Sequence, residues 1–158
     1  MIVATLILIL SASMFFFYFQ VTCQRILRRQ FDREYFQSIA NANHLEFLTL
    51  RESRAGSGDP AAYSRLCRVL EYDFLALTYL LKNAANVNQR YANEERFLIF
   101  YFHFQFLSLA VRHLLKLGEN QVIHRLTSVL QYFANVLGQR IDAVKFSYLI
   151  AAGNPLSF

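Results

Sequence analysis

The chain has 158 residues, of which 55% are hydrophobic and 16% aromatic, and it carries a formal net charge of +5. This is enough apolar material for one folded domain, and the lack of low-complexity or like-charged runs excludes a largely disordered chain. The 16 basic residues are spread along the sequence without a dense cluster, so nothing indicates a nucleic-acid-binding surface.

The first segment, residues 1–21, is predicted to be a transmembrane anchor. It reads MIVATLILILSASMFFFYFQV and contains no charged side chain. At about 1.5 Å per residue, a helix over residues 1–19 is roughly 28 Å long, close to the ~30 Å hydrocarbon core of a bilayer. An uncleaved anchor is favoured over a signal peptide, because no basic residue precedes the apolar run and its end, FFFYF, does not resemble a cleavage site.

Basic residues follow this segment directly and none precedes it. The positive-inside bias therefore predicts a single-pass topology, with the N-terminus outside and the rest of the chain in the cytoplasm. The same arginines can meet anionic headgroups at the membrane surface. The residues that we assign to the membrane interface are Tyr18, Arg25, Arg28, Arg29 and Arg33.

Residues 22–53 are predicted to form a juxtamembrane helix that continues the anchor, because no helix breaker occurs between Arg25 and Ala40. The Asn41–His44 stretch weakens the pattern and is where this helix bends or ends. Residues 54–60, RAGSGDP, contain two glycines and an Asp-Pro step, and they predict a loop. Residues 61–152 are then expected to form a helical bundle, with residues 153–158 as a tail.

The bundle begins with a helix that has Asp59 as its cap and Pro60 at its first position. Apolar residues at spacings of three and four predict that it continues to about Asn86. A further helix covers roughly Tyr91 to Leu117 and is apolar in every direction except for one narrow polar stripe. This pattern predicts a helix at the centre of the bundle. The stripe comprises Glu94, Tyr101, Gln105, Ser108, Arg112 and Lys116.

A second membrane span is the competing interpretation of that helix. However, the 15 residues between Arg96 and Arg112 reach only about 22 Å, short of the ~30 Å required. The last predicted helix runs from Asn120 to about Arg140, and whether it crosses Gly138 is left open. The apolar stretch that follows has three possible destinations, which are the membrane surface, the bundle and a partner. The fold class is all-α, an N-terminal transmembrane helix followed by an antiparallel bundle of about four helices.

Motifs for catalysis and metal binding are missing from the sequence. There is no glycine-rich phosphate loop, CxxC, HExxH or GxSxG motif. We therefore predict no catalytic residues, no metal site and no resident cofactor. Cys23 and Cys67 lie far apart in sequence, which favours a reducing compartment. We expect Cys67 to be a core residue. Cys23 lies at the membrane edge, where acylation is conceivable.

One pair of polar residues lies on apolar helix faces. Asp73 falls within the apolar arc of its helix, and His103 lies opposite the polar stripe, so both are expected to be buried. A satisfied core pair that fixes helix register is the simpler interpretation. The functional alternative makes His103 an axial ligand for a haem or a pigment in an aromatic pocket.

Two hypotheses of function follow from this pattern. The first is a non-catalytic, single-pass, membrane-anchored interaction module or accessory subunit of a membrane-associated assembly. Its partners would be the lipid bilayer and other protein subunits or a second copy of the chain. The alternative is a cofactor-binding electron-transfer or sensor protein that uses His103.

Overall fold

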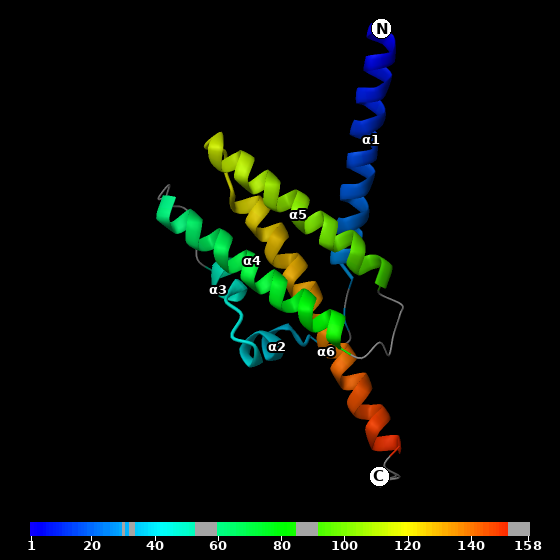
Figure 1. Ribbon diagram of the computed structural model, residues 1–158, viewed down its shortest axis with the longest axis vertical. Helices are drawn as coiled ribbons and strands as arrows, with labels where there is room; N and C mark the ends of the chain where they lie inside the picture. Colours follow the sequence, from blue (N-terminus) through cyan, green and yellow to red (C-terminus); the bar gives the residue numbers. More distant parts are fainter. Residues whose placement is uncertain (30, 32–33, 53–59, 85–91, 152–158) are drawn as a thin grey trace.

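The computed structural model describes residues 1–29, 31, 34–52, 60–84 and 92–151, and in these residues it contains six helices and no strand. The predicted all-α class, with an apolar N-terminal helix ahead of a helical bundle, is confirmed (Figure 1). The helices are α1 (Ile2–Leu27), α2 (Phe36–Ala42), α3 (Phe47–Glu52), α4 (Pro60–Asn83), α5 (Ala92–Leu114) and α6 (Asn120–Ala151).

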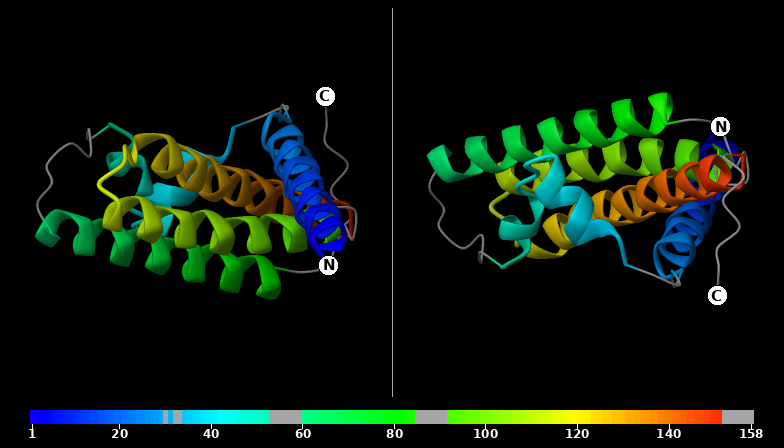
Figure 2. Two further views of the ribbon diagram at one scale, coloured as in Figure 1. Left: turned by 90° about the horizontal axis from the view of Figure 1, so that it is seen from above. Right: turned by 90° about the horizontal axis from the view of Figure 1, so that it is seen from below.

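The centre of the molecule is α6, which packs against all five other helices. Its middle turns are apolar nearly all round, and residues 132–138 are buried without interruption. Figure 2 shows α4 and α5 running beside α6, with α2 and α3 on another of its sides. The prediction that the helix over residues 91–117 would be central is therefore wrong. That position belongs to α6, because α5 keeps one face exposed.

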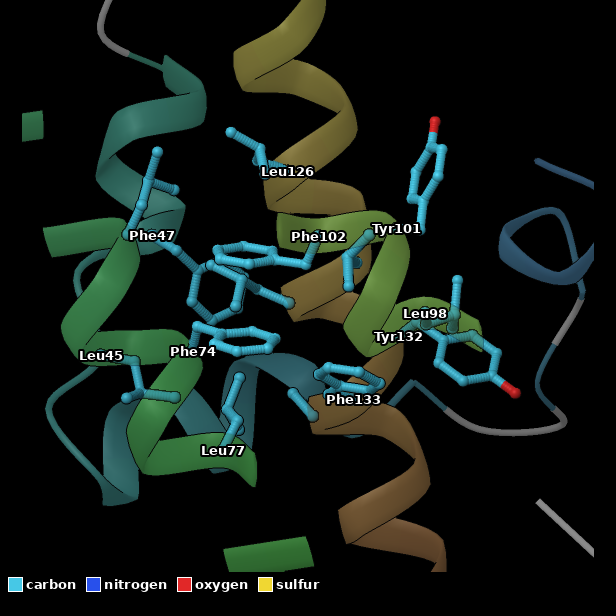
Figure 3. Packing of buried hydrophobic residues seen from close by; sticks show 14 of the residues in the cluster. Leu45, Phe47, Phe74, Leu77, Leu98, Tyr101, Phe102, Leu126, Tyr132 and Phe133 are labelled. Atoms are coloured by element: carbon cyan, nitrogen blue, oxygen red, sulfur yellow. The ribbon is translucent and has the colours of Figure 1, made fainter. Parts of the chain in front are cut away.

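Stacked aromatic rings fill the space between α4, α5 and α6. The rings of Phe74 and Phe102 are nearly parallel, with centroids 3.9 Å apart, and Phe133 approaches Phe74 at 6.1 Å (Figure 3). Aromatic side chains bury a large apolar area with few rotatable bonds. Three helices therefore converge on one rigid cluster.

The predicted continuous juxtamembrane helix is wrong. α1 ends at Leu27, the described residues from Arg28 to Tyr35 are not helical, and two short helices follow. The predicted break at Asn41–His44 is confirmed, since His44 adopts φ 53° and ends α2. The predicted loop over residues 54–60 falls outside the described residues apart from Pro60, and the predicted tail falls entirely outside them.

Buried polar side chains of the long helices hold the two short helices in place. Asn135 Oδ1 accepts the backbone N–H groups of Tyr35 and Phe36 at 2.8 and 2.9 Å, at the start of α2. Asp73 Oδ2 accepts the N–H of Phe47 at 2.7 Å, at the start of α3. The first N–H groups of a helix have no partner within it, so these bonds satisfy them from a neighbouring helix.

Gly138 does not interrupt α6, which runs through it from Asn120 to Ala151. A side chain at this position would overlap the Cβ of Tyr35, so the glycine allows the start of α2 to approach α6 closely. Beyond the bundle α6 continues as a free extension. Its end lies at the opposite end of the molecule from the start of α1 (Figure 1).

Candidate membrane-binding surface

Residues 1–18, which comprise the cap of α1 and its first 17 residues, are all exposed. They include Leu, Ile and Phe side chains around the whole circumference of the helix, and no side chain in the described part of the protein covers them except near the base of α1. A helix of 26 residues is about 39 Å long, more than the ~30 Å hydrocarbon core of a bilayer. By length and composition, the described residues contain two helices that can cross a membrane, residues 2–27 and 93–114.

The base of α1 carries the basic residues that the sequence placed at the membrane interface. Tyr18, Arg25 and Arg28 are exposed, while the guanidinium of Arg29 pairs with the carboxylate of Glu94 on α5 at 3.1 Å. Arg33 falls outside the described residues. The arginines thus form a positively charged rim at the base of α1, and one of them also ties α1 to the bundle.

A second exposed apolar surface runs along α5, which we term the α5 outer face. Its residues recur at spacings of three and four, so they share one side of the helix. This side joins the surface of α1, because the rings of Phe16 and Phe104 stack at 5.5 Å and Phe19 meets Phe100 at 5.5 Å. The residues of the α5 outer face are Phe97, Phe100, Phe104, Leu107, Val111 and Leu114.

The middle of the polar stripe of α5 points inward, whereas Lys116 at its end is exposed. Tyr101 is 0% exposed and Gln105 is 2% exposed, whereas Leu107 on the α5 outer face is 63% exposed. The hydrophobic pattern correctly separated two sides of this helix, but the polar side is the buried one. In water an apolar outer side is unfavourable, and in lipid it is the favourable arrangement.

Asp73 and His103 do not form the predicted buried pair. Asp73 is 1% exposed, as expected, but its carboxylate accepts N–H groups at the start of α3. Burial raises the pKa of Asp73 to about 6, while the hydrogen bonds from the backbone of Phe47 and Glu46 lower it. His103 is exposed, and its Nδ1 lies 2.8 Å from the carbonyl oxygen of Ile99.

These positions remove the basis for His103 as a buried axial ligand, because its ring packs edge-on against Phe74 at the surface. His113, which also lies on α5, is engaged by the carboxylate of Glu119 at 2.7 Å and stacks on Tyr63. No group of three His, Cys, Asp or Glu side chains that could hold a metal ion occurs in the described part of the chain.

Both cysteines are free thiols. Cys23 was placed at the membrane edge as a conceivable acylation site, but it is fully buried where α1 meets the bundle, so its sulfur is not accessible to an acylating enzyme. Cys67 is partly buried and packs against the core, as expected of a structural cysteine.

Comparison of the chain with protein-family models, curated proteins and solved structures gave no match.

Proposed function

We propose that this protein is a non-catalytic, single-pass membrane-anchored helical module that serves as an accessory subunit of a membrane-associated assembly. The observation that carries the proposal is the exposure of α1. Its apolar side chains are bare along most of its length, although the bundle has a complete core of its own. An exposed apolar helix of 26 residues requires lipid or protein around it.

The orientation is proposed from charge. The arginine rim lies at the base of α1, directly after the apolar run. The positive-inside bias then places the N-terminus outside and the bundle in the cytoplasm. In this arrangement the α5 outer face, which adjoins α1 near its base, also lies against lipid. The aromatic contact between Phe16 and Phe104 makes the two apolar surfaces continuous.

The proposed surface for a protein partner is the α6 extension, residues 141–150. It leaves the bundle at the end opposite the start of α1 (Figure 1), which supports a protein partner over either the bundle or the membrane as its destination. Its exposed apolar side chains have no neighbours to cover them in the described chain. These side chains are Ile141, Phe146, Tyr148, Leu149 and Ile150.

Purification of the full chain in a mild detergent, with identification of co-purifying proteins, tests this function. The variant Phe146→Ser/Leu149→Ser should lose co-purifying proteins that the unaltered protein retains. The matched control Leu75→Ser/Tyr79→Ser alters two exposed apolar residues on α4 and should retain them. Purification of the unaltered protein as a monomer without co-purifying proteins would contradict the proposal, and so would the same co-purifying proteins for both variants.

A further inference from the structure

A groove of about 600 Å³ lies between the base of α1 and the first half of α6. It is distinct from the apolar surfaces described above, because most of its lining side chains are polar. α1, α5 and α6 each contribute to it, so the groove exists only in the folded protein. Its principal lining residues are Gln24, Arg28, Tyr101, Gln121, His124 and Arg125.

The charge of this groove is entirely positive. Arg28 at the end of α1 and Arg125 and His124 on α6 line it, and no carboxylate of a described residue does. Neither arginine forms an ion pair with a described residue. Arginine presents several N–H donors in a planar fork that matches the oxygens of a phosphate group.

A buried hydroxyl without a partner lies at the floor of the groove. Tyr101 is 0% exposed, and its hydroxyl makes no hydrogen bond of normal length and angle to a described residue, although Gln105 lies beside it. Figure 3 shows Tyr101 pointing away from the aromatic core. A buried hydroxyl without a hydrogen-bond partner is unfavourable, so this position favours a ligand or water that accepts a hydrogen bond.

The position of the groove along α1 determines where it lies relative to the bilayer. Gln24 and Arg28 follow the end of the apolar run at Val21 by three and seven residues, which places them about 5 and 10 Å beyond it along the helix. The headgroup layer of a bilayer extends roughly 5–8 Å beyond the hydrocarbon core. The backbone of Arg28 therefore lies about 2–5 Å outside this layer, and its long side chain can extend back to the lipid phosphates.

We infer that this groove binds the phosphate of an anionic phospholipid headgroup. Arg28 and Arg125 hold the phosphate oxygens from two sides, and Tyr101 donates its hydroxyl hydrogen from below. The inference rests on the proposed anchoring of α1, which brings the groove to headgroup depth. It adds a specific lipid site to an otherwise general attraction between arginines and an anionic surface.

Native mass spectrometry of the full chain in non-ionic detergent tests this site, with phosphatidylglycerol and phosphatidylcholine as probes. The unaltered protein should retain phosphatidylglycerol preferentially. Arg28→Gln and Arg125→Gln should each weaken this retention about tenfold, and Tyr101→Phe about threefold. Arg25→Gln, which removes the same charge from the same helix outside the groove, should weaken it less than threefold.

Three results would overturn the inference. These are equal retention of the two lipids, equal effects of Arg25→Gln and Arg28→Gln, and displacement of the lipid by millimolar inorganic phosphate, which would indicate a site for free phosphate. Melting curves of each variant monitor folding, and Arg28 is exposed, so its replacement leaves the core intact. Carbonate extraction of membranes tests the anchoring of α1 separately. If the protein stays in the membrane but substitutions in the groove leave phosphatidylglycerol retention unchanged, only the lipid site is refuted.

Discussion

Arg140 joins three helices at the point where α6 leaves the bundle, and its replacement offers a quantitative test of the packing. The side chain is 5% exposed. Its Nη1 donates to the carbonyl oxygen of Leu81 on α4 at 2.8 Å, and its Nη2 donates to the carboxylate of Glu95 on α5. Arg140→Met retains an apolar stem in the same space and removes both interactions.

The expected loss follows from what remains after the substitution. The carboxylate of Glu95, whose side chain is 15% exposed, would stay buried without its cation, and the Leu81 carbonyl would lose a donor. Removing one partner of a buried ion pair costs about 3–5 kcal/mol. For a chain of this size, each kcal/mol lowers the melting temperature by roughly 2–4 °C, so Arg140→Met should melt roughly 10 °C lower.

Thermal unfolding in non-ionic detergent, followed by far-ultraviolet circular dichroism, measures this loss. The double variant Arg140→Met/Glu95→Gln removes the uncompensated charge as well, and it should recover at least half of the lost stability. Arg68→Met replaces an exposed arginine on α4 and should change the free energy of unfolding by no more than about 0.5 kcal/mol. An Arg140→Met melting temperature within 2 °C of the unaltered protein, or a double variant no more stable than the single one, would refute the reasoning.

Three further outcomes are expected. Because the pKa of Asp73 rises from 3.8 to about 6 on folding, the folded state keeps a proton that the unfolded chain has lost, and stability should fall as pH rises from about 4 to about 6. Melting profiles against pH should show this fall reduced in Asp73→Asn, and parallel profiles would exclude the assignment. Gly138→Ala should destabilise the protein by about 1–3 kcal/mol or more in the same melting assay, through overlap with Tyr35, and a neutral result would contradict the close approach. The chain has no Trp, so the fluorescence of Phe104→Trp reports only the surroundings of the α5 outer face. Brominated lipids should quench this fluorescence more than that of Tyr72→Trp on α4, and equal quenching would argue against lipid contact.

The sequence by itself determined the features that depend on local chemistry. The uncharged run of residues 1–21 identified α1, because its composition suits a membrane wherever the rest of the chain lies. Pro60 marked the start of α4, and Asn120 marked the start of α6. The break near His44 was also visible, since residues that favour turns express that preference within a few neighbours.

The tertiary structure alone decided how these elements face one another. The spacing of polar and apolar residues on α5 defines two sides, but it does not state whether water, lipid or protein lies against each, and Tyr101 proved to be buried while Phe104 is exposed. Asp73 was correctly predicted to be buried, yet its partner is the N–H of Phe47, which lies 26 residues away in sequence. Contacts of this kind form only when distant segments meet, so no local pattern encodes them, and the groove between α1 and α6 arises in the same way.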